Sequence, residues 1–304
     1  MGSKWLFLSL LLLIMGYKTV PQHFQINLNE NNVPAKSLKM VSFNVRVFDL
    51  YMWSEKKTTR NGIFDFLDKQ DADVVCLQEF YNSTRQDPNY EFKTLDTLKQ
   101  FLRAKNYHVD YTTTLRGTDN WGLITFSVYP IINRGKVPFP DESDNTCIFT
   151  DIVKGEDTIR IYNMHLASIK LEKNDYKTAQ LESDKSYKEQ MKRDKEMLGK
   201  LKAGFRVRAR QADAIAESVK NSPHPVILCG DFNDTPSSYA YRTISKGLKD
   251  AFVQKGSGMG RTYNGKLPSF RIDYILHSPN MSTYKFQNHK VYLSDHFPLS
   301  ASIK

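Results

Sequence analysis

Short apolar stretches alternate with polar segments along most of the chain, and their lengths and spacing predict strands interrupted by helices. Strands are expected at residues 38–45 and 73–77, in several short pieces between 107 and 165, and at 226–229, 271–276 and 297–303. Apolar residues at helical spacing predict short helices around 63–67 and 95–102. Many strands with helices at intervals predict an α/β fold, in which two packed sheets are covered by helices within one domain, residues 33–304.

A helical insertion is expected at about residues 170–222. Its apolar positions repeat at intervals of four and three, which predicts one face of a helix, at Phe205, Ala209, Ala212, Ala216 and Val219. An earlier helix is expected to carry Met191, Leu198 and Leu201. Gly204 predicts a break between the two helices, which would then pack as a hairpin.

The N-terminal end is more apolar than the rest of the chain. Residues 5–15 read WLFLSLLLLIM and are interrupted only by Ser9. This run is too short to span a bilayer comfortably, because spanning takes about 20 residues. It suits a signal-peptide core or an anchor belonging to a longer membrane region. We therefore assign residues 1–32 to a hydrophobic segment with a linker, and expect an exported protein or one attached to a membrane through residues 5–16.

The net charge of +10 is concentrated in the predicted insertion. Residues 170–210 hold thirteen Lys/Arg and seven Asp/Glu, a net charge of +6. Such a segment suits nucleic acid or anionic lipid, although a mixed charge run is more often the solvated face of a helix. The three cysteines show no zinc or redox spacing. Cys76 and Cys229 lie inside apolar runs, which predicts small core residues.

Polar residues stand at or near the ends of several predicted strands. They are Asn44, Glu79, His165, Asp231, Asn233, Asp273, Asp295 and His296. Most of them, taken alone, have an ordinary explanation as a turn residue, a solvated acid or a hydrogen-bonded histidine. Asp273 is harder to explain, because a carboxylate inside an apolar strand requires a partner. Together they indicate a site, since the ends of strands in layered α/β folds are where ligands bind.

The chemistry of this set is coherent. Carboxylate and amide oxygens without cysteine favour a hard cation, Mg²⁺ or alternatively Mn²⁺. Histidines can donate protons and contact phosphate. An aspartate beside an asparagine can orient water and stabilise the charge on a five-coordinate phosphorus. The set therefore predicts metal-assisted attack of water on a phosphoester.

Six motifs resemble those of the endonuclease/exonuclease/phosphatase superfamily, the DNase I-like metal-dependent phosphoesterases. They are SFNV, LQE, NMHL, GDFND, RIDYIL and SDH, in the family's order from Ser42 to His296. The resemblance implies a four-layer α/β/β/α sandwich with mixed, mostly antiparallel sheets. It also implies a metal site formed by Glu79, Asn44 and Asp295.

The resemblance implies catalytic roles as well. Asp231 would orient or deprotonate the attacking water, and Asn233 would hold the transition-state oxygens. His296 would contact the scissile phosphate with Asp273 as its orienting partner, while His165 would lie near the leaving group.

Two departures from the family weigh against abasic-site repair. Arg46 stands where abasic endonucleases tend to carry an aspartate, and the NMHL histidine differs from their pattern at this strand. Phosphodiesterase, nuclease and phospholipase C-like activities remain open, acting on nucleic acid or on a phospholipid headgroup. The alternative of another class is a membrane-attached binding module on this fold without turnover. We expect a monomer.

Overall fold

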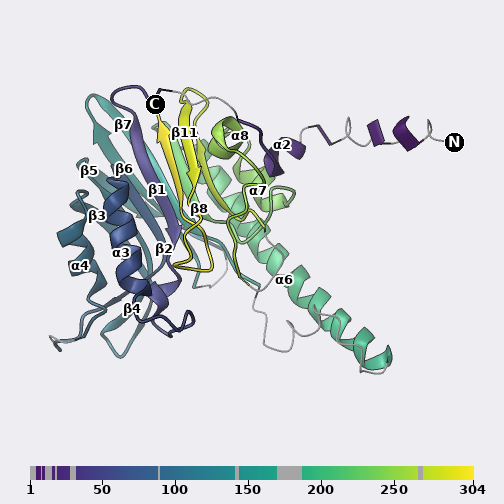
Figure 1. The fold of residues 1–304 in the computed structure, drawn as a ribbon, viewed down its shortest axis with the longest axis horizontal. Helices are drawn as coiled ribbons and strands as arrows, with labels where there is room; N and C mark the ends of the chain where they lie inside the picture. The colour runs from purple at the N-terminus through teal and green to yellow at the C-terminus, as the bar shows by residue number, and fades with distance from the viewer. Residues whose placement is uncertain are drawn as a thin grey trace.

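The computed structural model of the chain describes residues 5–7, 9–10, 16–17, 19–27, 32–87, 90–140, 144–169, 187–265 and 270–304. Within them, two six-stranded sheets face each other, and helices cover their outer faces (Figure 1). The α/β/β/α sandwich expected from the sequence is confirmed. The domain boundary at residue 33 stays a prediction.

The first sheet has the strand order β11-β12-β1-β2-β4-β3. Its strands are β1 (Leu38–Asn44), β2 (Val74–Ser83), β3 (Asn106–Leu115), β4 (Asp119–Ser127), β11 (Thr283–Asn288) and β12 (Leu299–Ile303). Only β1 and β2 pair in parallel. A short 3-10 turn, η1 (Arg46–Asp49), follows β1. On the outer face lie α3 (Thr59–Gln70) and α4 (Thr94–Phe101), whose Ile63, Leu67 and Leu98 share one core cluster with Val41 and Val75.

The second sheet has the strand order β5-β6-β7-β8-β10-β9. Its strands are β5 (Ile131–Lys136), β6 (Thr146–Lys154), β7 (Asp157–His165), β8 (Val226–Asp231), β9 (Lys249–Asp250) and β10 (Asp273–His277). Only β7 and β8 pair in parallel. Other helices whose bounds lie within the described residues are α2 (Val20–His23), α6 (Tyr187–Lys220), α7 (Tyr239–Ile244) and α8 (Ala251–Lys255). Ala212 and Ile215 of α6 pack with Tyr241 of α7 on the outer face of this sheet.

An apolar layer fills the space between the sheets. It is made by alternate residues of facing strands, because successive side chains of a strand point to opposite faces. Met40 and Cys76 from the first sheet meet Ile161, Cys229 and Ile275 from the second. Cys76 and Cys229 are fully buried and form no disulfide, which confirms their predicted role in the core.

The predicted break at Gly204 is wrong, because α6 runs without interruption through this residue. A Cβ atom at Gly204 would lie 3.1 Å from the side chain of Ile169. The glycine therefore allows the helix to pass close to the chain after β7, and it does not end the helix. Residues 170–186 of the expected insertion lie outside the described residues.

Most of the apolar run at 5–15 also lies outside the described residues, so a signal or anchor there stays a prediction. In the part of the chain that the structure describes, no helix combines the length and apolar character needed to cross a membrane.

Candidate active site

The strand alternation that builds the core also delivers polar side chains to one end of the sandwich. In β8, Ile227 and Cys229 face the other sheet, and Asp231 is the next residue with the same orientation. The register places His165 of β7 beside Asp231 on one side. It places Asp273 of β10 beside Asp231 on the other side.

Glu79 reaches the same place through a bulge. Regular alternation would send its side chain outward, because Leu77 belongs to the core under α3. The pairing of β2 with β4 shifts register between Leu77 and Phe80, and Glu79 adopts a left-handed backbone with φ of 50°. A bulge of this kind re-aims a side chain. The Glu79 carboxylate consequently lies 3.0 Å from the amide nitrogen of Asn44.

Asp231 is the centre of the cluster. Its Oδ2 accepts a hydrogen bond from Asn44 Nδ2 at 3.0 Å, and Nε2 of His165 and of His296 each lie 3.6 Å from this oxygen. Its Oδ1 accepts the main-chain N–H of Asn233 at 2.7 Å. Burial raises the pKa of Asp231, and the positive charge of His296 opposes this shift. The carboxylate is therefore fixed in position and more basic than an exposed aspartate.

His296 is held by Asp273, with Nδ1 lying 2.9 Å from Oδ2 of the carboxylate. Burial disfavours a charged imidazole, but Asp273, Asp231 and Asp295 outweigh it and hold the pKa of His296 well above its ordinary value. These charges favour the protonated imidazole, which can donate hydrogen bonds from both nitrogens. The buried partner that Asp273 was expected to need is His296.

Asn233 occupies a constrained position at the start of the loop after β8. Its backbone is left-handed, with φ of 51°. Its side-chain amide donates to the carbonyl of Leu166 at 2.9 Å, and Asn145 donates to the same carbonyl at 3.0 Å. One amide hydrogen of Asn233 is thereby used to orient the group, and the second is available to a ligand.

Glu79 and Asp295 are further acidic residues of the cluster, and their metal role stays a prediction. Burial raises the pKa of Asp295; the negative charge of Glu79 adds to this effect, whereas His296 and Arg46 oppose it. Nε of Arg46 lies 3.4 Å from Oδ2 of Asp295. Two nearby carboxylates, one of them paired with a cationic side chain, are a suitable donor set for a hard divalent cation.

Asn44 contacts these acids differently from a simple metal ligand. Its amide oxygen accepts the main-chain N–H of Arg46 at 3.1 Å, so its nitrogen is directed to the carboxylates of Glu79 and Asp231. In this arrangement Asn44 connects the proposed metal carboxylate to the central aspartate. Its metal role stays a prediction.

Asp231, Asp273 and His296 also lie close enough to share a cation, with ligand atoms within 4.8 Å of one another. The hydrogen bond between Nδ1 of His296 and the Asp273 carboxylate already uses one ring nitrogen of this group. A cation on the side of Glu79 and Asp295 stays a prediction.

Several supporting residues were not predicted. Ser294 donates from its hydroxyl to the main-chain oxygen of Asn44 at 2.8 Å. Behind the site, Gln78 donates to Asn163 at 2.7 Å across the gap between the sheets. The sequence carried a signal, since each amide follows a buried apolar residue on the same face of its strand, Cys76 in β2 and Ile161 in β7.

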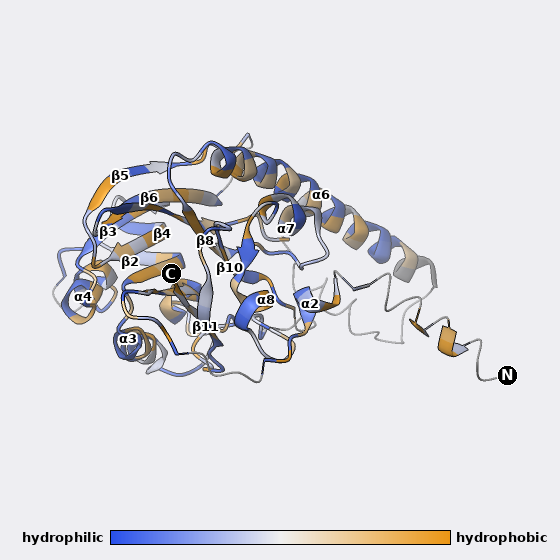
Figure 2. Cartoon of the chain, turned by 90° about the horizontal axis from the view of Figure 1, so that it is seen from above, coloured by the Kyte–Doolittle hydropathy of each residue, from blue (hydrophilic) through white to orange (hydrophobic). Residues whose placement is uncertain are grey.

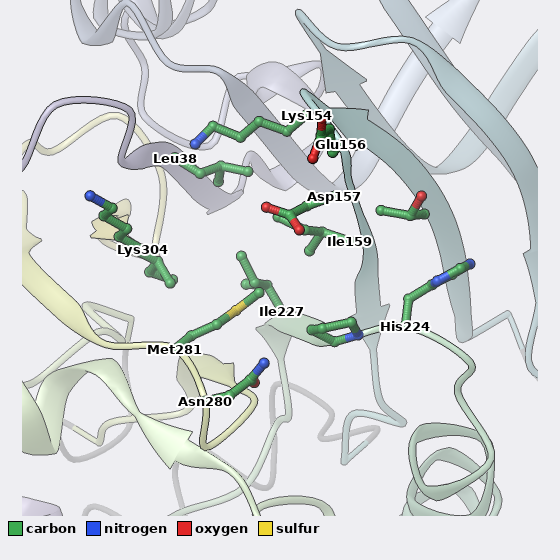
Figure 3. Close-up of a pocket in the computed structure, with 13 residues that line it drawn as sticks. Leu38, Lys154, Glu156, Asp157, Ile159, His224, Ile227, Asn280, Met281 and Lys304 are labelled. Carbon is green, nitrogen blue, oxygen red and sulfur yellow. The ribbon is translucent and has the colours of Figure 1, made fainter.

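A cavity of about 370 Å³ opens beside the cluster. Glu79 and His165 line it together with Tyr51, Trp121 and Asn145. A second cavity, of about 500 Å³, is lined by residues near the starts of β1, β7 and β8, including Leu38, Ile159 and Ile227 (Figure 3). It lies at the other end of these strands from Asn44, His165 and Asp231. The first cavity is therefore the one that adjoins the polar cluster.

The family model described as "Endonuclease/Exonuclease/phosphatase family" matches residues 41–296, from β1 to His296. The chain belongs to the endonuclease/exonuclease/phosphatase family. The eight predicted residues all fall within this match, and the family's members are generally metal-dependent phosphoester hydrolases. No curated protein matches the chain by sequence.

Solved structures share the family fold at low sequence identity. A family protein from Leptotrichia buccalis has a TM-score of 0.61 and 17% identity, covering 88% of this chain and 100% of that one. The human Nocturnin catalytic domain with a bound sulfate anion has a TM-score of 0.62 and 14% identity, covering 88% and 94%. The mannosyl-6-phosphatase of Bacteroides thetaiotaomicron has a TM-score of 0.58 and 18% identity, covering 88% and 100%.

Proposed function

We propose that this family member is a divalent-metal-dependent hydrolase of phosphoester bonds, in which water attacks phosphorus in line. The observation that carries the proposal is the position of Asp231. This buried carboxylate lies 3.6 Å from His165 and from His296, and a hydrogen bond from Asn44 joins it to Glu79. A potential base, Asp231, and two potential proton donors, His165 and His296, therefore lie around one place where a phosphoester could bind.

The residues around this place have different roles in the proposed reaction. Asp231 accepts a hydrogen bond from the attacking water and takes up its proton, for which a raised pKa is an advantage. Asn233 and the protonated His296 donate to the phosphoryl oxygens, whose negative charge grows as water adds. Asp273 preserves the orientation and charge of His296.

His165 completes the reaction on the other side of phosphorus. It lines the cavity of about 370 Å³, so a leaving group placed there is within reach of its imidazole. Protonation of the departing oxygen by His165 avoids expulsion of an alkoxide.

Glu79 and Asp295 would hold the cation, Mg²⁺ or Mn²⁺, with Asn44 beside them. When bound, the ion would stabilise negative charge on the phosphate oxygens. Nucleic acid and phospholipid headgroups are the substrate classes that we propose for the cavity. We also propose attachment to a membrane, to which the apolar run at 5–16 would contribute.

The test is a substrate panel with a matched blank. The purified full-length protein is incubated with plasmid DNA, RNA, sphingomyelin, p-nitrophenyl phosphate and bis-p-nitrophenyl phosphate, with and without Mg²⁺. Glu79→Gln, which keeps the shape of the side chain but not its charge, serves as the blank. We expect Mg²⁺-dependent turnover that the blank lacks. Binding of phosphorylated ligands without turnover of any substrate would instead support a binding module.

A further inference from the structure

The N-terminal half of α6 extends beyond the body of the domain (Figures 1 and 2). The contact of Gly204 with Ile169 marks the point where the helix meets the body. Residues 187–203 precede this contact, and at a rise of 1.5 Å per residue they form about 25 Å of helix. We call residues 187–203 the projecting segment.

An apolar stripe runs along this segment and continues to Phe205. Met191, Leu198 and Phe205 are separated by seven residues each, so they lie on one side of the helix. Their exposed fractions are 56%, 64% and 49%. Three large apolar side chains this exposed on one side of a helix leave apolar surface that a partner can cover.

Basic residues lie along one side of the stripe, and Asp194 lies on its other side. Lys195 and Lys202 follow Met191 and Leu198 by four residues, which places them next to the stripe on the same side of the helix. Residues 191–206 hold six Lys/Arg and two Asp/Glu, a net charge of +4. The surface therefore combines an apolar stripe with a positive border.

A second copy of the chain fits this surface poorly. A coiled-coil seam needs apolar residues three or four positions after each stripe residue. Of those six positions, four hold the charged residues Asp194, Lys195, Lys202 and Arg208, and only Leu201 and the small Ala209 are apolar. Two helices of charge +4 would also repel each other. Nucleic acid would use the basic residues but gives no role to the exposed stripe.

We propose that the projecting segment docks on an anionic phospholipid surface. The stripe enters the boundary between headgroups and acyl chains, and Lys195, Lys202 and Arg206 contact anionic headgroups. This combination of an apolar face with Lys/Arg beside it is what interfacial helices require.

The attachment of α6 to the body gives the docked protein an orientation. Arg208 is buried, and it donates to the carboxylate of Asp234 and to the carbonyl of Ala167, both at 2.9 Å. Asp234 follows Asn233, and Ala167 lies two residues after His165. The projecting segment therefore leaves the body beside the catalytic cluster, and a surface bound to it lies close to that cluster.

A fluorescent reporter on the helix separates this docking from any binding by the apolar N-terminal run. The three native cysteines are fully buried, so a cysteine placed on the exposed helix is labelled selectively. Leu198→Cys reports on the stripe and Glu196→Cys reports on the opposite side of the same helix. Each full-length variant carries an environment-sensitive dye and is mixed with vesicles of phosphatidylcholine, with or without phosphatidylglycerol.

We expect a blue shift at position 198 and none at position 196, only with phosphatidylglycerol present, and weakened by added salt. Vesicles that sediment the protein while leaving the dye at position 198 unchanged would overturn the proposal, because another segment would then be responsible. Equal shifts at both positions would overturn it as well, since the stripe would have no special role.

Two sets of substitutions test the stripe and the charges separately. Changing Met191, Leu198 and Phe205 together to Ser keeps the charge, and we expect vesicle affinity to fall about tenfold or more. Lys195→Gln and Lys202→Gln should each lower the affinity for anionic vesicles about fivefold. Unchanged vesicle binding by the triple variant, with loss of plasmid binding in the lysine variants, would favour nucleic acid instead. A dimer in sedimentation velocity that the triple variant dissociates would favour a second copy.

Discussion

Nδ1 of His296 lies 2.9 Å from Oδ2 of Asp273, and both side chains are almost fully buried. The carboxylate determines which ring nitrogen faces it and favours the protonated imidazole, so Nε2 is left to act toward Asp231 and a substrate. This pair explains why an aspartate stands in the otherwise apolar stretch IDYIL.

Replacing Asp273 by Asn should therefore lower kcat by about 10²–10⁴-fold, the usual contribution of a positioned acid or base. The asparagine retains the shape but removes the charge that holds the proton on His296. His296→Gln should cause a loss of similar size, and the double variant should be little worse than either one, because the two residues act as a unit. Fully additive losses would show that Asp273 acts independently of His296.

Chelation should abolish activity, and Mg²⁺ or Mn²⁺ should restore it. Glu79→Gln should raise the Mg²⁺ concentration needed for half-maximal rate by about tenfold or more, because one carboxylate of the proposed metal site is lost. Asp65→Asn, on the exposed side of α3, is the matched control and should leave this concentration unchanged. Thermal unfolding with and without Mg²⁺ gives a readout that does not depend on turnover. Full activity in excess EDTA would exclude the metal.

Asn233 should be tested as glycine as well as alanine. Loss of its amide should cost about 10²–10³-fold in kcat, as removal of an oxyanion donor does. Alanine would add strain at a φ of 51°, about 1 kcal/mol of stability, whereas glycine accepts this conformation. Equal kcat values for the two variants, with a lower Tm only for alanine, would separate chemistry from backbone strain. A glycine variant of normal kcat would remove Asn233 from the mechanism.

Much of the site could be predicted because side chains alternate between the two faces of a strand. Once the strand in PVILCGD is recognised, Asp231 must face the same side as Cys229, and core strands bring His165 and Asp273 to its flanks. The fold was predictable for the same reason, since many short strands with helices between them have few ways to bury both faces.

The parts that could not be predicted depend on tertiary contacts or on departures from alternation. The sequence around Glu79 contains no glycine or proline that would predict the bulge that turns its side chain inward. Gly204 has the sequence character of a helix end, yet it serves a close contact with Ile169 inside a continuous helix. The ion pair of Arg46 with Asp295 joins residues far apart in the chain, so spacing carries no sign of it.

His289 should make the protein less stable as the pH falls. Burial, with Lys39 and Lys285 nearby, lowers its pKa from 6.5 to about 4. Between these values the unfolded chain binds a proton that the folded chain does not, so the free energy of unfolding decreases as pH falls from 6.5 toward 4. The loss should be about 1–2 kcal/mol once solvent screening at this half-buried ring is allowed for. Urea unfolding at pH 7 and pH 5 should show a smaller pH effect for His289→Gln than for the wild type, and equal effects would contradict this assignment.

Gly230 is the residue whose substitution by alanine should be least tolerated in the GDFN motif. Its φ is 138°, and an added Cβ would lie 2.0 Å from the carbonyl oxygen of Met164 in the paired strand. Relief of this clash requires β7 and β8 to separate, which would move His165 away from Asp231. We expect Gly230→Ala to lose about 2–4 kcal/mol of stability and most of its activity.

Gly199→Ala is the matched control, because nothing lies within 4 Å of its added Cβ and alanine favours the helix by up to about 1 kcal/mol. Thermal unfolding of the two variants should therefore shift Tm in opposite directions, and a Gly230→Ala protein of normal Tm and activity would show that β7 and β8 can yield without disturbing the site.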